Sequence, residues 1–240
     1  MKKYRKGRLW IFFAIDPIGL PHTSLIFYLS SLLIALLLVF LTFQAYRLKS
    51  YRYFFLFLQL SQVIGLYTWY VLRGFPLDEA LPLYHCRIAM LAIFFLPDRN
   101  KFKQLFMVLG IGGTFLALLS PDLYPFRLWH VANVSFYLGH YALLVNGLIY
   151  LLRFYDASQL RLLSVVRYLA TINFLLLLVS LATKGNYGFV MDIPVIHTRH
   201  LLLNFVIVTS GLTFMVKITE YFYLKFGEAQ QLALAFSKEK

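Results

Sequence analysis

Cysteine is almost missing from this sequence, because Cys86 is the only one in 240 residues. A single cysteine excludes an intramolecular disulfide, so Cys86 is either a packed apolar side chain or a reactive thiol. Acidic residues are also scarce, with ten Asp and Glu against 23 Lys and Arg. The basic residues form short clusters between long apolar runs, and no nucleic-acid-binding motif accompanies them. We therefore expect neither a nucleic-acid partner nor a cofactor or metal.

Charged residues make up only 14% of the chain, whereas 60% of its residues are hydrophobic. The core of a soluble protein of this length would not bury so much apolar surface, so we expect an integral membrane protein. The N-terminus lacks a continuous signal-peptide core, because Asp16, Pro17 and Pro21 interrupt its first apolar stretch. We therefore expect no cleavage there.

Seven apolar runs approach the length of about 20 residues that a transmembrane helix needs. They predict an all-α, polytopic bundle of about seven transmembrane helices in a single domain covering residues 1–240, with a polar C-terminal tail at 225–240. The third and fourth runs are short and are the least certain to cross as regular helices. The predicted helices lie near 24–46, 53–72, 82–97, 103–120, 131–152, 162–183 and 201–224.

Lysine and arginine are distributed unevenly among the predicted loops. The loops after the first, third and fifth predicted helices, together with the C-terminal tail, carry more of them than the alternate loops do. Because cytoplasmic loops are enriched in Lys and Arg, this pattern predicts a multi-pass protein of the cell membrane with its N-terminus outside and its C-terminus in the cytoplasm. The basic N-terminal cluster from Lys2 to Arg8 favours the opposite orientation.

Histidines gather on the other side of the predicted bundle. None lies in a loop rich in Lys and Arg, and His140 alone lies deep within a predicted helix. Intramembrane polar groups are costly unless they face one another or water, so this segregation predicts a polar cavity that opens on one face. The histidines on this side are His22, His85, His130, His197 and His200.

Cys86 and His140 form the first candidate catalytic pair. Both helices enter the membrane from the same side, and at about 1.5 Å per residue the two side chains differ in depth by roughly 8 Å. A thiol in apolar surroundings is inert, whereas a neighbouring imidazole can take its proton and leave a nucleophilic thiolate. Asn133 and Tyr137 share the helix face of His140. The alternative is that Cys86 packs beside its neighbours and His140 makes an interhelical hydrogen bond.

The sequence HTRH at 197–200 is a second constellation, with Asn204 one turn further on. Two histidines three residues apart can bind a metal, and His22 or His130 could supply a third ligand. This spacing is common by chance, so an interfacial polar collar against lipid headgroups is the favoured interpretation. His200 and Asn204 remain candidates for binding a substrate.

Asn173 and the loop that follows its helix form a third constellation. The sequence GNYG places Asn186, Tyr187 and Gly188 in a structured turn. Such a loop could close over the cavity as a lid or donate hydrogen bonds to an oxyanion, and it could equally be a simple turn. Asn173 and Tyr187 are therefore further candidate site residues.

Three motifs together resemble a known family. LPLYHCRIAM opens one predicted helix, VSFYLGHYALLVNGLIYLL forms a later one, and GNYGFVMDIP precedes the last. In this order they resemble the integral membrane family related to transmembrane protein 164, whose vertebrate members are thiol-dependent phospholipid acyltransferases. Bacterial members are expected to carry a histidine two residues before the cysteine, where this chain has Tyr84, with His85 next to it. That departure leaves the role of His85 open.

The resemblance implies that Cys86 is the nucleophile and His140 its base. The implied reaction passes an acyl group from a membrane phospholipid to a thioester on Cys86 and then to a lysophospholipid or another alcohol. Asn133, Tyr137 and Asn173 are candidates for stabilising the oxyanion, and Arg87 for holding a headgroup phosphate. Two alternatives stay open: a transporter or small-ligand-binding membrane protein, and a lipid hydrolase that uses the same pair.

Overall fold

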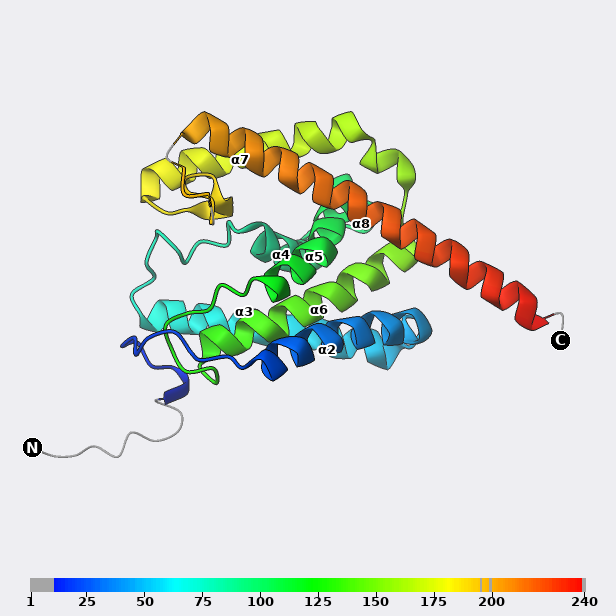
Figure 1. The fold of residues 1–240 in the computed structure, drawn as a ribbon, viewed down its shortest axis with the longest axis horizontal. Helices are drawn as coiled ribbons and strands as arrows, with labels where there is room; N and C mark the ends of the chain where they lie inside the picture. Colours follow the sequence, from blue (N-terminus) through cyan, green and yellow to red (C-terminus); the bar gives the residue numbers. More distant parts are fainter. Residues whose placement is uncertain (1–10, 195, 199, 239–240) are drawn as a thin grey trace, which may run out of the picture.

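The computed structural model describes residues 11–194, 196–198 and 200–238, with side chains up to residue 227. Within these residues the chain is helical and contains no β-strand (Figure 1). The helices are α2 (Leu25–Ala45), α3 (Lys49–Leu72), α4 (His85–Phe95), α5 (Lys101–Leu119), α6 (Val131–Phe154), the 3₁₀ turn η1 (Ala157–Leu160), α7 (Leu162–Thr183), the 3₁₀ turn η2 (Tyr187–Phe189) and α8 (Leu201–Lys238).

Six of the helices in the described part of the chain are long and apolar enough to cross a membrane. The predicted class, an all-α polytopic membrane bundle, is therefore confirmed. The exception is α4, whose 11 residues span only about 16 Å. A bilayer core is about 30 Å thick, so α4 cannot cross it unaided. The helix predicted near 82–97 is thus shorter in the structure, and the irregular segment 73–84 precedes it.

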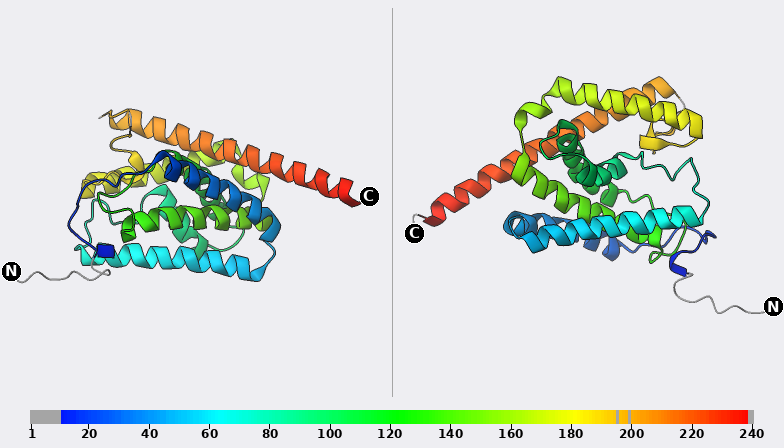
Figure 2. Two further views of the ribbon diagram at one scale, coloured as in Figure 1. Left: turned by 60° about the horizontal axis from the view of Figure 1, so that its bottom comes forward. Right: turned by 180° about the vertical axis from the view of Figure 1, so that it is seen from behind.

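The centre of the bundle is formed by α5 and α6, which are buried along most of their length. α6 packs against α3, α5 and α2, while α4 packs mainly on α5 (Figure 1). α7 and α8 pair with each other along a second side of the bundle, as Figure 2 also shows. The outer helices expose many leucine and phenylalanine side chains, such as Leu33, Phe57 and Phe214. These apolar faces suit contact with lipid tails.

α8 is the longest helix in the described chain, with 38 residues. It crosses the bundle and continues well past the other helices at its C-terminal end (Figure 1). The segment from residue 225, expected to be a polar tail, is thus helical as far as Lys238. No proline interrupts the sequence of α8, so the helix can continue without a break.

The starts of α2, α5 and α6 are each fixed by a side chain that accepts a hydrogen bond from a free amide of the first turn. Ser24 caps α2 through the amide of Phe27, and Asn100 caps α5. His130 caps α6 through its Nδ1, which accepts from the amide of Ala132 at 3.2 Å. α4 has no such cap, as is also true of α3 and α7, because the side chain of Tyr84 makes no hydrogen bond to the first turn. The first turn of α4 therefore keeps free N–H groups.

Candidate active site around Cys86

The irregular segment 73–84 runs inward from the end of α3 to α4 in the middle of the bundle (Figure 1). Backbone at such a position needs partners within the protein. The hydroxyl of Tyr187 donates to the carbonyl of Leu77 at 2.6 Å and accepts from the amide of Leu81 at 3.2 Å. Arg87 donates to the carbonyl of Glu79 at 2.7 Å. The segment is thus held by the loop after α7 and by α4 itself.

The loop after α7 packs directly against the first residues of α4. Tyr187 is fully buried, and its ring meets that of Tyr84 edge-on at 5.4 Å. Gly188 has a φ of +63°, and a Cβ there would lie 2.7 Å from Cε1 of His85. Both the backbone angle and the lack of space therefore require glycine at this position. Tyr187 was a candidate for a lid or an oxyanion donor. The structure places its hydroxyl on backbone groups, where it positions the start of α4.

Cys86 lies in the first turn of α4 and faces α5. A Cβ added to Gly113 would lie 3.3 Å from Cys86 Sγ, so the absence of a side chain on Gly113 leaves room for the thiol. One turn further along α4, Met90 reaches α6, because a Cβ on Gly139 would lie 2.9 Å from its Cε. Glycines on both neighbouring helices therefore bring α5 and α6 close to α4 at this level.

His140 follows Gly139 on α6 and is buried. Its Nδ1 lies 2.7 Å from the carbonyl oxygen of Phe136. A carbonyl can only accept, so Nδ1 carries the proton and Nε2 keeps a free lone pair. Nε2 makes no hydrogen bond with any described residue. This tautomer is the one that a general base requires.

Thr114 on α5 forms a hydrogen bond with the backbone of His140 on α6. Its hydroxyl lies 3.0 Å from the carbonyl oxygen of His140 and 2.8 Å from that of Gly110. The neighbouring residue on α5 is Gly113, which faces the thiol. Two consecutive residues of α5 thus touch the helix turns that carry the predicted nucleophile and base. Within the described residues no hydrogen bond joins Cys86 to His140 directly.

Free backbone amides lie at the start of α4, in the same turn as Cys86. The first amide bonded within the helix is that of Ile88, which donates to the carbonyl of Tyr84 at 2.9 Å. The N–H groups of His85, Cys86 and Arg87 have no hydrogen-bond partner in the described part of the chain. Together they form a positive helix end that can hold an anion. Sequence analysis did not identify these amides, because they depend on where α4 begins.

His85 belongs to a buried hydrogen-bond relay that joins three helices. Its Nε2 donates to Oδ1 of Asn173 on α7 at 2.8 Å. Nδ2 of Asn173 donates in turn to Oγ1 of Thr209 on α8 at 2.9 Å. Asn173, a candidate oxyanion donor, is thus committed to the histidine beside Cys86. The relay fixes the first turn of α4 against the α7–α8 pair.

Arg87 lies in a cage of tyrosines on the other side of the thiol. Its Nη2 donates to the hydroxyls of Tyr70 at 2.7 Å and Tyr124 at 2.9 Å, and its guanidinium stacks 4.7 Å from the ring centre of Tyr84. No carboxylate among the described residues lies within ion-pair distance of it. Arg87 is therefore a mostly buried cation with free capacity for an anion.

Asn133, on the helix face of His140, serves the loop before α6. Its Oδ1 accepts from the amide of Tyr124 at 2.8 Å, while its Nδ2 faces the carbonyls of Tyr124, Phe126 and Arg127. The side-chain amide is thus occupied by backbone groups. Its effect on the site passes through Tyr124, whose hydroxyl contacts Arg87.

Tyr137, His200 and Asn204 form no hydrogen bond with Cys86 or His140. Tyr137 packs edge-on against Phe27 of α2, with ring centres 5.4 Å apart. Asn204 donates to the carbonyls of Met191 and Thr198, both at 2.9 Å. His200 is exposed. Tyr137 and Asn204 thus support helix and loop contacts.

The described residues contain no group of three His, Cys, Asp or Glu side chains that could hold a metal. Histidines at 197 and 200 therefore find no third ligand there, and His130 instead caps α6 and stacks on Phe126 at 4.1 Å. Arg199, in the same HTRH motif, and the basic N-terminal cluster lie outside the described residues.

The contacts that sequence analysis missed are those of Gly113, Gly139 and Thr114. Glycines in apolar helices, as in the sequence GIGGTF at 110–115, can indicate close helix packing. The pattern alone does not say which partner approaches. The structure shows that the partners are Cys86 for Gly113 and Met90 for Gly139.

Comparison with known proteins gives one match. A model of the TMEM164 family matches residues 18–219, which include α2 to α7 and most of the membrane part of α8. No curated protein and no solved structure matches the chain significantly.

Proposed function

This chain belongs to the TMEM164 family, and we propose that it is a membrane acyltransferase that moves a fatty acyl chain between glycerolipids through a thioester on Cys86. One observation carries the proposal. The thiol lies at an uncapped helix start against Gly113, and the next residue of α5, Thr114, holds the backbone of His140, whose tautomer leaves Nε2 free. A thiol used only for packing would need neither the free amides nor the free Nε2.

The first half-reaction forms the thioester. Nε2 of His140 takes the proton of Cys86, and the thiolate attacks the ester carbonyl carbon of a donor phospholipid. The carbon–sulfur bond forms, the carbonyl π electrons move to oxygen, and the tetrahedral intermediate then expels the lysolipid alkoxide. His140 returns its proton to that alkoxide.

The second half-reaction reverses these steps with another alcohol. The hydroxyl of an acceptor lysophospholipid gives its proton to Nε2 of His140 and attacks the thioester carbonyl. The carbon–sulfur bond then breaks, and Cys86 regains the proton. Exclusion of water by the surrounding helices favours the lipid hydroxyl over hydrolysis.

The free amides of the first turn of α4 are suited to hold the oxyanion. Removing a single donor of this kind typically lowers kcat about 10²–10³-fold in other enzymes. The N–H groups of Cys86 and Arg87 belong to the residues closest to the thiol, and the helix dipole adds to their effect. Arg87, caged by tyrosines, is suited to bind the phosphate of the donor or the acceptor.

Labelling of the protein with an alkyne-tagged acyl phospholipid tests the proposal. The purified protein is placed in vesicles with the tagged donor, and the covalent adduct is detected after coupling to a dye. We expect a hydroxylamine-sensitive adduct in the wild type and none in Cys86→Ala. Cys86→Ser is expected to give either no adduct or one that resists mild hydroxylamine, because an oxygen ester is less reactive.

The control for a general loss of histidine is His22→Ala, because His22 is exposed in the loop before α2. It should label like the wild type. Equal labelling of the wild type and Cys86→Ala would refute the thioester and favour a ligand-binding or transport role. A labelled wild type that releases free fatty acid, even with lysophospholipid present, would identify a hydrolase.

A further inference from the structure

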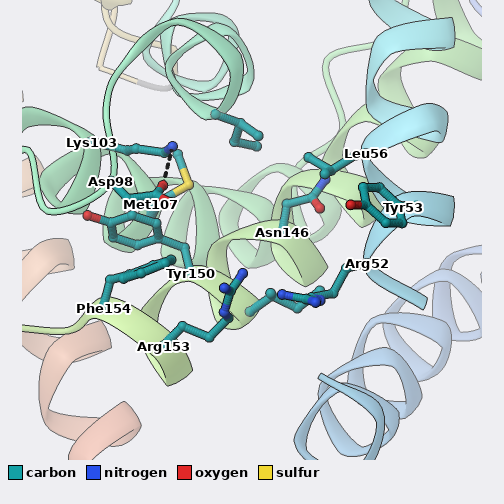
Figure 3. Close-up of a pocket in the computed structure, with 12 residues that line it drawn as sticks. Arg52, Tyr53, Leu56, Asp98, Lys103, Met107, Asn146, Tyr150, Arg153 and Phe154 are labelled. Carbon is teal, nitrogen blue, oxygen red and sulfur yellow. Dashed lines mark hydrogen bonds and ion pairs between the residues drawn. The ribbon is translucent and has the colours of Figure 1, made fainter. Parts of the chain in front are cut away.

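A cavity lies at the opposite end of α4 from Cys86. It encloses about 480 Å³ between α3, α5, α6 and the turn after α4 (Figure 3). Ile93, which lines it, follows Cys86 by seven residues, or roughly 10 Å along the helix. The cavity is thus a separate feature from the thiol and its free amides. None of the candidate site residues described above lines it.

Three cations but a single carboxylate line this cavity. Lys103 bonds to Oδ1 of Asp98 at 2.8 Å and to the carbonyl of Leu96 at 2.9 Å, so its charge is compensated. Arg52 and Arg153 have no ion-pair partner among the described residues. Figure 3 shows both guanidinium groups extending into the space from α3 and α6. The cavity therefore carries two uncompensated positive charges.

Asp156, an acidic residue close to the end of α6, does not neutralise these arginines. Asp156 follows α6, and its carboxylate accepts hydrogen bonds from Ser158 and Gln159 instead. Nε of Arg52 is buried and has no hydrogen-bond partner. The buried hydroxyl of Tyr150, which also lines the cavity, has none either. Donors without acceptors in a cationic cavity favour an anion with several oxygen atoms.

Apolar side chains also line the cavity. Met107 and Ile149 are buried and Leu56 is half-buried, whereas Arg153 is exposed. Beside it on α3, Gln59 is fully buried, and neither atom of its side-chain amide has a partner. Gln59 lies three residues from Leu56 and therefore on the same helix face. A ligand here would meet charge at its outer end and apolar side chains further in.

We propose that this cavity binds the phosphate of an anionic lipid, with Arg52 and Arg153 as its ligands. Guanidinium groups bind phosphate oxygens in bidentate fashion, and the cavity lies at the Lys- and Arg-rich end of the bundle. The phosphate lies between the two arginines, and the glycerol part extends toward Leu56 and Met107. The assignment does not depend on acyl transfer, so Cys86→Ala should bind the lipid as the wild type does.

Titration with soluble short-chain lipids tests the site. The full-length protein in phosphatidylcholine nanodiscs is titrated with dioctanoyl phosphatidic acid, and binding is measured by native mass spectrometry. We expect Arg52→Gln with Arg153→Gln to weaken binding at least about tenfold, the loss expected from removing charge-assisted hydrogen bonds. Arg153→Gln alone should weaken it less. Arg153 is exposed and has no ion pair with any described residue, so this variant should fold.

The matched control removes the same charge elsewhere. Arg161 and Arg167 are exposed at the start of α7 and do not line the cavity. Arg161→Gln with Arg167→Gln should leave binding within about threefold of the wild type. Equal weakening by the two double variants would overturn the site in favour of general charge attraction. Binding of inorganic phosphate as tight as that of the lipid would overturn the lipid as the occupant.

Discussion

At the scale of single residues, the argument depends on a histidine whose two ring nitrogens have different tasks. Nδ1 is held by the carbonyl of Phe136, and this bond leaves Nε2 unprotonated. Thr114 holds the backbone of the same histidine through its carbonyl. A proton transfer from Cys86 then requires only that Nε2 comes within reach of Sγ or of a bridging water.

Replacing His140 should therefore remove the base without removing the nucleophile. His140→Ala is expected to slow thioester formation by about 10²–10⁴-fold, the usual contribution of a general base. Single-turnover labelling with the alkyne-tagged donor measures this rate, and His22→Ala is the control. A rate within threefold of the wild type would show that another group takes the proton.

Gly113 offers a second test, because it sets the space around the thiol. Gly113→Ala would place a methyl group 3.3 Å from Sγ, so the thiol must shift by a few tenths of an ångström. We expect slower thioester formation, up to about 10²-fold, with little change in thermal stability. The control is Gly211→Ala on α8, where a Cβ meets nothing within 4 Å. If both variants keep the wild-type rate, the packing around Cys86 does not matter for chemistry.

At the scale of elements, the important feature is a helix that begins inside the bundle. α4 starts at His85, after a segment that the loop containing Tyr187 holds in place. The free amides next to Cys86 exist only because of this break. A continuous helix from residue 82 would have used them in its own hydrogen bonds.

Removing one hydroxyl should loosen this arrangement. Tyr187→Phe leaves the carbonyl of Leu77 and the amide of Leu81 without their partner, at a cost of about 1–3 kcal/mol. We expect a lower Tm and faster hydrogen exchange in residues 73–84. Tyr221→Phe, on an exposed face of α8, should change neither quantity. Unchanged exchange in the first variant would mean that other contacts hold the segment.

The sequence predicted the long helices well, because the length of an apolar run directly reflects the thickness of a bilayer. It did not predict where α4 begins, since that depends on contacts with residues 184–192, about a hundred positions away. The predicted difference in depth between Cys86 and His140 assumed a continuous helix from Pro82, because the sequence did not show that α4 begins only at His85. The sequence indicated Cys86 and His140, because a thiol and an imidazole are typical catalytic groups. It did not indicate Gly113 and Thr114, because their contacts depend on how α5 packs against α4 and α6.

At the scale of the whole molecule, the described chain has six helices long enough to cross a membrane and the shorter apolar helix α4. A seventh passage through α4 would place the start of α2 and the end of α8 on opposite sides of the membrane. The balance of Lys and Arg in the loops favours a cytoplasmic C-terminus. On this orientation the cationic cavity faces the cytoplasmic leaflet, and the loop over α4 faces outward.

Reporter fusions test this orientation in a bacterial host. A green fluorescent protein placed after Lys240 should fluoresce, because it folds well only in the cytoplasm. Alkaline phosphatase fused at the same position should be inactive there. Active phosphatase without fluorescence would reverse the orientation, and it would place the cationic cavity in the outer leaflet.

The central claim is that Cys86 carries the acyl group during turnover. Its most direct test is mass spectrometry of the intact wild-type protein, quenched in acid after mixing with a phospholipid of defined chain length, followed by peptide mapping. We predict a mass increase equal to one acyl chain minus one hydrogen, located on Cys86 and lost when lysophospholipid is added. A protein that turns over donor and acceptor with Cys86 unmodified throughout would contradict the account.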